Sequence, residues 1–283
     1  MNKEFSSSSR TAVGIFAATI LLFLPTWLWL GDAWMSDPYY SHGPLVLLIS
    51  LYLVWTRRKL FSNSSPAPNN LGLILIAIGF AIHLWAIVWR AFYLSALMIP
   101  LVMLGLIVTL FGHRIAKQFL FPLGFLILMV PLPLAERVGP VLEGWTATSA
   151  TAFAQRLGVP AQNIGSQVLL PNSAFTVGIP CGGLRSTIAI LTLVTLFAYV
   201  VRGAGWARAL IFLVAIPIAL AANTLRLALL FAIANGWGAQ AGLDYFDSPW
   251  SSLVLFLSAF ALLLALAKLI GASNVRWEVV TPS

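Results

Sequence analysis

The chain contains 283 residues, of which 60% are hydrophobic and 8% are charged. Soluble domains carry about 25% charged residues, so this composition excludes an ordinary soluble domain and indicates a polytopic membrane protein in a lipid bilayer. The net charge of +8 does not predict nucleic-acid binding, because the basic residues are dispersed between apolar segments. The single cysteine excludes an intramolecular disulfide and a multi-cysteine metal site.

Apolar segments of spanning length recur along the chain and predict an all-α polytopic membrane protein with about eight transmembrane helices. The predicted spans are 11–30, 40–56, 71–89, 92–111, 116–133, 183–201, 207–234 and 250–270. No clear small-x-small cleavage site follows the first span, so we expect it to be a retained anchor. We treat residues 1–283 as a single membrane-embedded domain.

The distribution of Lys and Arg predicts a cytoplasmic N-terminus. In that orientation eleven basic residues lie inside, three lie outside and two lie within spans, as the positive-inside rule requires. The inner residues are Lys3, Arg10, Arg57, Arg58, Lys59, Arg114, Lys117, Arg202, Arg208, Lys268 and Arg276, the outer ones are Arg90, Arg137 and Arg156, and the two within spans are Arg185 and Arg226. We therefore expect a multi-pass protein whose segment before residue 183 faces outward.

One long extramembrane segment, 134–180, lies between the fifth and sixth predicted spans. Residues 136–157 mix apolar and polar side chains, which predicts an amphipathic helix on the membrane surface or over the bundle. Two short β-like runs, 167–170 and 174–177, flank Pro171 and predict a hairpin. The sequence thus predicts an outer-side cap made of a helix and a short β-hairpin.

The only cysteine, Cys181, follows Pro180 and precedes the sixth predicted span. Its sulfur is expected near a helix N-terminus, where exposed backbone N–H groups and the helix dipole favour the thiolate. Arg185 lies one helical turn later on the same side and adds a permanent positive charge. This pattern indicates an activated nucleophile. The alternative is a small buried residue packed beside Gly182 and Gly183.

Arg226 is the second candidate site residue, and it lies deep in the span 207–234. A charge inside a span is costly and normally faces the bundle interior, where it is functional or paired. Arg226 is expected about 12 Å from the outer end of its helix, at 1.5 Å per residue. Asn223 shares its helix face and is expected to orient the guanidinium. The alternative is an arginine that bonds to helix carbonyls and pins the bundle.

Two acidic residues precede the last predicted span. Asp247 is either a partner of an arginine or proton acceptor in the site, or part of the helix cap ahead of Pro249. Asp244 is expected to lie in a solvated loop.

His42 is the histidine expected at the right depth to assist the cysteine, because His83 lies in mid-span and His113 is cytoplasmic. It is expected at the outer end of the second span. The alternative is an interfacial histidine beside Tyr39 and Tyr40.

Taken together, these motifs resemble those of the exosortase/archaeosortase family of membrane-embedded cysteine transpeptidases. The family's C-[SG]-G motif is matched at 181–183, its N-x-x-R motif at 223–226, its Y-S-H-G motif at 40–43 and its W-x-R-R motif at 55–58. The resemblance extends from about residue 34 to residue 270, with the motifs in the family's order.

The chain departs from the family pattern at one position. The family's third catalytic residue, a histidine or an arginine, follows a phenylalanine near the start of the last span, where this chain has Asp247 after Phe246. A carboxylate beside the sulfur would oppose thiolate formation. Three explanations are open: Asp247 is a base or an Arg226 partner in a divergent site, His42 does the histidine's work, or catalysis is lost and substrate binding is kept.

The resemblance implies a cysteine protease and transpeptidase of the cytoplasmic (inner) membrane, without a metal or organic cofactor. Its substrates would be membrane-anchored proteins with a C-terminal sorting signal: a short motif such as Pro-Glu-Pro, a membrane helix and a basic cluster. The implied catalytic residues are Cys181, Arg226 and Asp247, supported by Arg185, Asn223 and His42. The alternative is a non-catalytic docking or transport protein in exopolysaccharide or protein export, in which Arg185 and Arg226 bind an anionic substrate.

Overall fold

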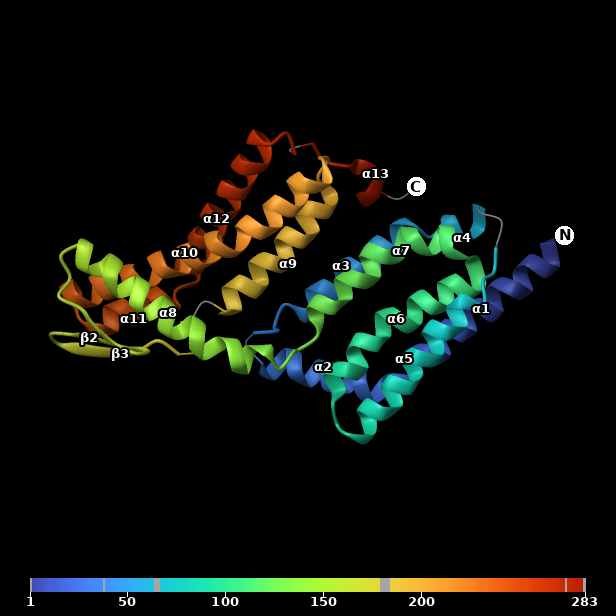
Figure 1. Ribbon diagram of the computed structural model, residues 1–283, viewed down its shortest axis with the longest axis horizontal. Coiled ribbons are helices and arrows are strands. Elements are labelled where there is room, and N and C mark those ends of the chain that lie inside the picture. The colour runs from blue at the N-terminus through green and yellow to red at the C-terminus, as the bar shows by residue number, and fades with distance from the viewer. Residues whose placement is uncertain (1, 38, 64–66, 179–183, 273, 282–283) are drawn as a thin grey trace. The chain divides into compact units, whose positions relative to one another are not determined.

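The computed structural model describes residues 2–37, 39–63, 67–178, 184–272 and 274–281, and most of them are helical (Figure 1). The chain divides into two compact units, Met1–Leu132 with Trp277–Ser283 (unit 1) and Pro133–Arg276 (unit 2). Each unit is described separately below.

Unit 1 consists of helices. They are α1 (Asn2–Leu22), α2 (Leu24–Ser36), α3 (Gly43–Thr56), α4 (Leu60–Asn63), α5 (Leu71–Val88), α6 (Phe92–Phe111), α7 (His113–Phe125), the 3-10 helix η1 (Leu126–Met129) and α13 (Trp277–Val280). The most extensive pairing joins α5 to α6. A Cβ at Gly72 would lie 2.4 Å from the carbonyl oxygen of Gly105, so glycine allows these two backbones to approach closely.

The first predicted span, 11–30, is not one straight helix. Helices α1 and α2 meet at a 59° bend after Leu22. Pro25 lies in the first turn of α2. Its nitrogen carries no hydrogen and cannot donate a backbone hydrogen bond, and its ring clashes with the preceding turn, so a continuous straight helix is disfavoured here. The hydroxyl of Thr26 then bonds to that of Ser95 on α6, which fixes α2 after the bend.

Four described helices are long and apolar enough to cross a membrane, namely α5, α6, α10 and α12, and the bent α1–α2 pair provides a fifth if it counts as one span. Two further predicted spans correspond to shorter apolar helices, α3 with 14 residues and α9 with 17. The predicted span 116–133 is divided between α7 and η1, with Pro122 inside α7. By length and composition the structure therefore supports four or five of the eight expected spans.

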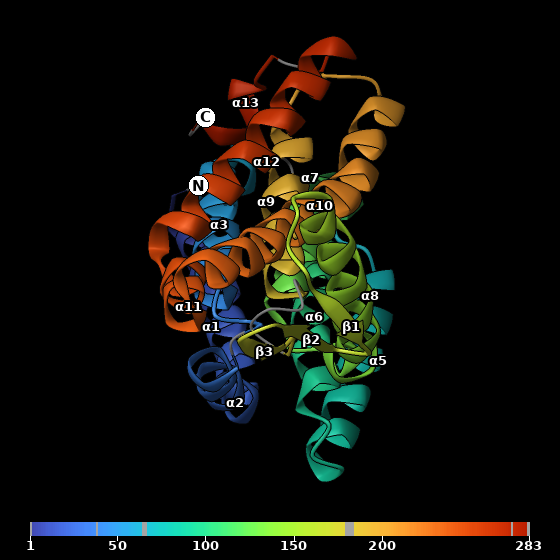
Figure 2. The ribbon, with the colours of Figure 1, turned by 90° about the vertical axis from the view of Figure 1, so that its left-hand side faces the viewer.

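Unit 2 combines long helices with a small sheet. Its elements are α8 (Leu134–Arg156), β1 (Gln162–Ile164), β2 (Gln167–Leu170), β3 (Ser173–Thr176), α9 (Leu184–Val200), α10 (Gly205–Trp237), α11 (Ala239–Asp247) and α12 (Pro249–Leu269). A helix and a hairpin thus occupy the segment in which we expected them, and β1 adds a strand that we did not predict. The sheet is antiparallel in the order β1-β2-β3 and lies beside α8 (Figures 1 and 2).

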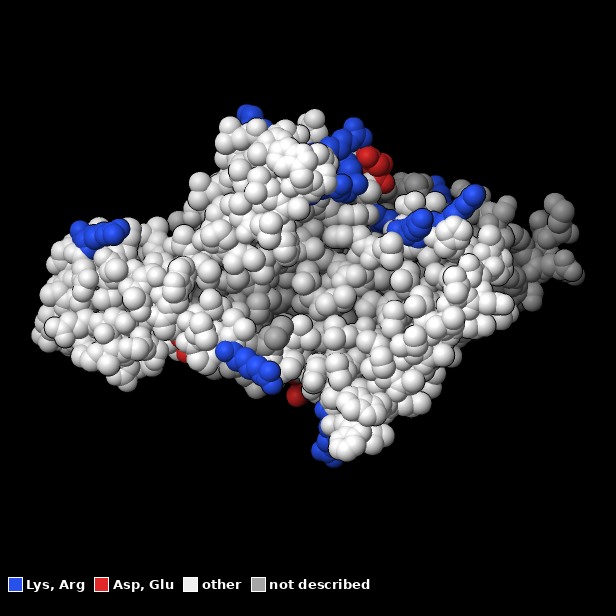
Figure 3. All heavy atoms as spheres, in the orientation of Figure 1, with Lys and Arg blue, Asp and Glu red and all other residues white. Residues whose placement is uncertain are grey.

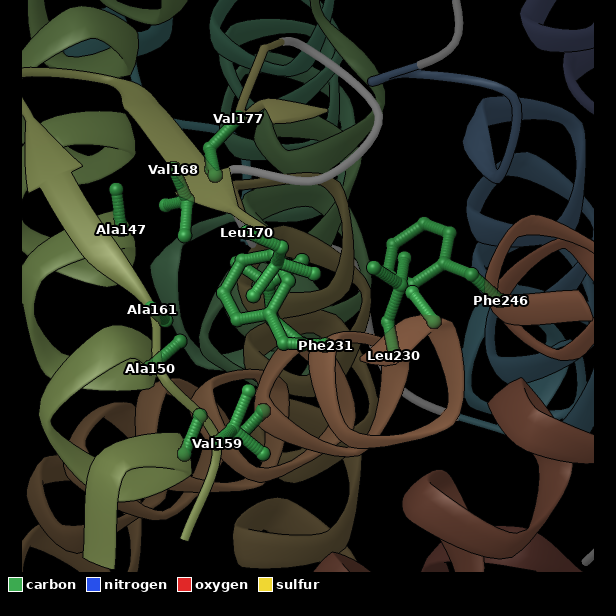
Figure 4. Close-up of a cluster of buried hydrophobic side chains, with 14 residues drawn as sticks. Ala147, Ala150, Val159, Ala161, Val168, Leu170, Val177, Leu230, Phe231 and Phe246 are labelled. Atoms are coloured by element: carbon green, nitrogen blue, oxygen red, sulfur yellow. The ribbon is translucent and has the colours of Figure 1, made fainter. Parts of the chain in front are cut away.

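Helix α10 connects two separate hydrophobic cores. Its 33 residues span about 50 Å at 1.5 Å per residue, well beyond the roughly 30 Å of a bilayer core. The N-terminal half, from Ala207 to Ala219, packs with α9 and α12. The C-terminal part, from Leu227 to Ala234, packs with α8, the sheet and α11 (Figure 4). Among the described buried residues, the second core contains none from α9 or α12.

The surface agrees with a membrane environment. Large apolar side chains are exposed along the spanning helices, among them Leu84 and Trp85 on α5 and Val254 and Leu257 on α12. The face drawn in Figure 3 is mostly uncharged, and most of the charged side chains on it are basic. Extended apolar surface of this kind marks a lipid-facing or otherwise covered surface.

Candidate active site

Arg226 lies on α10 between the two cores of unit 2. Ala219 is the last buried α10 residue of the core with α9 and α12, against which Ala222 also packs, and Leu227 is the first of the core with α8 and the sheet. Asn223, only 1% exposed, lies in the same short interval. The sequence predicted Arg226 deep in the span 207–234, and the structure places it in α10, between the core with α9 and α12 and the core with α8 and the sheet.

The guanidinium of Arg226 binds Phe246, near the C-terminal end of α11. Its Nη2 donates a hydrogen bond to the carbonyl oxygen of Phe246. Its Cζ lies 3.9 Å from the centroid of the Phe246 ring, within cation–π range. The same carbonyl accepts a second hydrogen bond, from Ser251 Oγ at 3.0 Å. Arg226 thereby joins α10 to the α11–α12 turn.

Helix α11 is a correction to the sequence analysis, which expected a loop around Asp244. Gly242 faces α10 so closely that a Cβ there would lie 3.0 Å from the carbonyl oxygen of Leu230. One helical turn later Phe246 is buried, and in Figure 4 it points toward Leu230. Asp244 is exposed on the opposite side and accepts a hydrogen bond from Gln240 at 2.8 Å.

Asp247 is the last residue of α11, one residue after the carbonyl that Arg226 binds. Its side chain is exposed, and within the part of the chain that the structure describes its carboxylate has no ion pair or hydrogen bond. Ser248, not Asp247, is the N-cap of α12, because its side chain accepts a hydrogen bond from the N–H of Ser251 at 3.2 Å. Asp247 is therefore not required for the cap.

Tyr245 is a neighbour of Arg226 that the sequence analysis did not select. Burial raises the pKa of its phenol, and the positive charge of Arg226 partly offsets that rise. The hydroxyl therefore stays protonated near neutral pH and is able to donate a hydrogen bond. The helical spacing of Gly242 and Phe246 would have revealed that α11 folds against α10, and hence that Tyr245 lies near the arginine.

Arg185 and Cys181 come from the segment ahead of α9. Cys181 lies outside the described residues, and so do Gly182 and Gly183. Described structure resumes at Leu184, where α9 begins, and Arg185 is exposed in its first turn. Helix α9 packs along α10, so Arg185 and Arg226 belong to neighbouring helices of unit 2.

His42 belongs to unit 1, where it immediately precedes α3. Its Nε2 lies 3.3 Å from the carbonyl oxygen of Leu128, and the imidazole is half-buried. Burial lowers the pKa of His42, and hydrogen bonds to the Leu128 and Tyr39 backbone partly offset this. The ring is therefore predominantly neutral near pH 7.

Residues close to His42 also form hydrogen bonds to the segment 128–132, which contains Leu128. The hydroxyl of Tyr40 accepts a hydrogen bond from the N–H of Leu132 at 3.1 Å. The indole Nε1 of Trp34 donates to the carbonyl oxygen of Met129 at 2.9 Å. A Cβ at Gly43 would lie 2.1 Å from that Nε1, so only glycine leaves room for the indole. The Tyr-Ser-His-Gly motif thus anchors residues 128–132 at the end of unit 1.

Among the described residues, no group of three or more His, Cys, Asp or Glu side chains is arranged to hold a metal ion.

Comparison with protein families gives one informative match. The model of the transmembrane exosortase family matches residues 34–265, which is most of the chain. This confirms the resemblance that the cysteine, arginine and histidine motifs indicated. Comparison with curated proteins and with solved structures gives no match.

Proposed function

Because the chain belongs to the transmembrane exosortase family, we propose that it is a membrane-embedded cysteine transpeptidase. Its substrates are membrane-anchored proteins with a C-terminal sorting signal, made of a short motif such as Pro-Glu-Pro, a membrane helix and a basic cluster. It cuts near the motif, outside the cytoplasmic membrane, and transfers the new carboxyl end to an acceptor.

The observation that carries this proposal is the position of Arg226. Arg226 is a half-buried cation on α10 between two hydrophobic cores, and we propose that the peptide of a membrane-anchored substrate reaches it there. Its hydrogen bond to a main-chain carbonyl of α11 supports a role toward peptide carbonyls, because the same donor geometry suits a carbonyl oxygen of a substrate.

The proposed chemistry begins at Cys181. The thiolate attacks the carbonyl carbon of the scissile peptide bond, and Arg226, assisted by Arg185, stabilises the thiolate and the oxyanion of the tetrahedral intermediate. The C–N bond then breaks, the amine leaves with the proton that the cysteine thiol lost on becoming a thiolate, and the substrate remains as a thioester on the sulfur. An amine, hydroxyl or water attacks the thioester, which releases the product and returns the thiol.

The third role is proposed for Asp247, as a base or as an electrostatic partner of Arg226. In its favour are its position next to Phe246 and its exposed carboxylate, which the α12 cap does not use. His42 is proposed as a supporting residue that acts through the anchored 128–132 segment. Asn223 is proposed to orient the guanidinium from the buried face of α10.

A non-catalytic docking protein is the second candidate. The observation that favours it is that Arg226 already forms a hydrogen bond and a cation–π contact with Phe246. An arginine whose role is structural is expected to make such contacts between helices. In that case the substrate binds and is not cut.

Co-expression with a tagged sorting-signal protein tests the proposal. Wild type is expected to shorten the tagged protein, and Cys181→Ala and Cys181→Ser are expected to abolish that shortening while reaching the membrane at the same level. Processing that survives Cys181→Ala overturns the enzyme. Co-purification of an uncut substrate with wild type as well as with Cys181→Ala identifies the docking protein instead.

A further inference from the structure

The small sheet of unit 2 has two edges, and they differ in what lies beside them. At the β1 edge, Thr148 of α8 donates a hydrogen bond to the Asn163 side chain at 3.1 Å. Gln155 of α8 donates to the carbonyl oxygen of Ala161 at 2.8 Å, just before β1 begins. Side chains of α8 therefore flank this edge. β3 pairs only with β2 and forms the other edge.

The register shows which backbone groups of β3 point away from the sheet. The N–H of Val177 bonds to the carbonyl oxygen of Ser166 at 2.8 Å, so this pair is hydrogen-bonded. In an antiparallel ladder hydrogen-bonded pairs alternate with pairs whose N–H and C=O groups point outward. Ala174 and Thr176 occupy the outward positions. Both are exposed, and no described group bonds to their backbone.

The β3 strand packs on α10, and within the described residues its edge lacks two of the devices that commonly protect an edge strand. Side chains alternate between the two faces of a strand, so Phe175 lies on the face opposite to the side chains of Ala174 and Thr176. It packs on Phe231 of α10, with ring centroids 5.9 Å apart. The strand reads Ser-Ala-Phe-Thr and contains no charge and no proline, two devices that normally prevent an edge from pairing with another strand. Because this edge is already ordered and its outward backbone groups are available, it binds an extended peptide without losing further conformational entropy of its own.

Cys181 follows Thr176 by five residues, so covalent geometry keeps their Cα atoms within about 18 Å. About five extended residues of a second chain cover the same distance. A segment paired with β3 therefore lies within one short strand's length of the proposed nucleophile.

We propose that the outer edge of β3 binds the extended segment that precedes the membrane helix of the protein substrate, by β-strand addition through Ala174 and Thr176. This inference rests on the proposed function for its choice of substrate. A Pro-Glu-Pro segment fits such an edge, because proline restricts its own backbone and that of the preceding residue to extended geometry. The central residue keeps the N–H and C=O groups that pair with β3.

Photo-crosslinking tests binding without relying on catalysis. The probe is an epitope-tagged single-span protein that ends in Pro-Glu-Pro, an apolar helix and a basic cluster. We expect p-benzoylphenylalanine in place of Thr176 to crosslink to this probe in the Cys181→Ala background. The same replacement of Arg156, exposed at the end of α8, is the matched control and is expected not to crosslink. No crosslink at position 176, with the protein present in the membrane, overturns the proposal.

A pair of variants tests the backbone contact itself. Thr176→Pro removes the outward donor, and Thr176→Val keeps it with a side chain of the same shape. We expect Thr176→Pro to lower processing roughly threefold to tenfold, as the loss of one hydrogen bond predicts, and Thr176→Val to stay within about twofold of wild type. Equal processing by both variants overturns strand addition even if Cys181 is essential. Crosslinking at position 176 with processing independent of Cys181 upholds strand addition and overturns the enzyme.

Discussion

Arg226 and Phe246 form a double contact: the guanidinium donates to the Phe246 carbonyl and lies 3.9 Å from the centroid of its ring. The contact connects the long helix α10 to the C-terminal end of α11, which carries Tyr245 and Asp247. Any movement of that end of α11 therefore changes the surroundings of Arg226.

The first prediction separates the charge of Arg226 from its pinning contact. Arg226→Gln keeps a hydrogen-bond donor and removes the charge, so we expect processing to fall about 100-fold or more while the protein remains folded. Processing of the tagged substrate and the thermal midpoint in detergent are the two measurements. Arg226→Lys is the control that keeps the charge. A large drop in midpoint for Arg226→Gln, matched by the drop in processing, would make the residue structural.

The second prediction concerns Asp247. Exposed side chains outside a cap contribute within about 0.5 kcal/mol to stability, so Asp247→Ala and Asp247→Asn should leave the thermal midpoint unchanged. We expect both variants to lower processing about 100-fold, the usual contribution of a general base. Ser248→Ala is the contrasting change, expected to cost about 1 kcal/mol of stability through loss of the α12 cap. Full activity of Asp247→Ala would assign the third role to another residue.

The third prediction follows from the lowered pKa of His42. The folded protein binds fewer protons at this site than the unfolded chain does, so stability rises with pH between the folded pKa and the ordinary value of about 6.5. Stability from this site is fully present above pH 6.5 and is lost as the pH falls below it. Thermal midpoints measured from pH 5 to pH 8 should show a smaller acid-side decrease for His42→Gln than for wild type. Parallel curves for the two proteins would contradict the role of His42 as a buried anchor.

The fourth prediction tests the α5–α6 contact in unit 1. Gly72→Val places methyl groups against the Gly105 backbone, which has no room to move, so we expect a destabilisation of about 1–3 kcal/mol. Gly124→Ala is the matched control, because a Cβ there meets nothing within 4 Å. Folded yield in detergent and the thermal midpoint distinguish the two. Equal yields would show that α5 and α6 separate easily.

The long helices, the hairpin and the family of this protein could be predicted from local sequence patterns. Long runs of apolar residues specify membrane helices wherever they occur, so α5, α6, α10 and α12 were predicted close to their observed bounds. The hairpin of β2 and β3 was predicted from a different local signal, because Pro171 and Asn172 form a turn between two β-like runs. The family was evident from short motifs whose order and spacing survive in the linear chain.

What the tertiary structure alone decided depends on contacts between residues distant in the chain. The surroundings of Arg226 are set by which elements pack on each half of α10, and one helix sequence does not reveal that two different cores meet along it. The anchoring of residues 128–132 by the Tyr-Ser-His-Gly motif likewise depends on partners about 90 residues apart in the chain. Hydrophobic patterning fixes which segments are helices, but only close packing decides which faces meet and therefore which polar side chains come together.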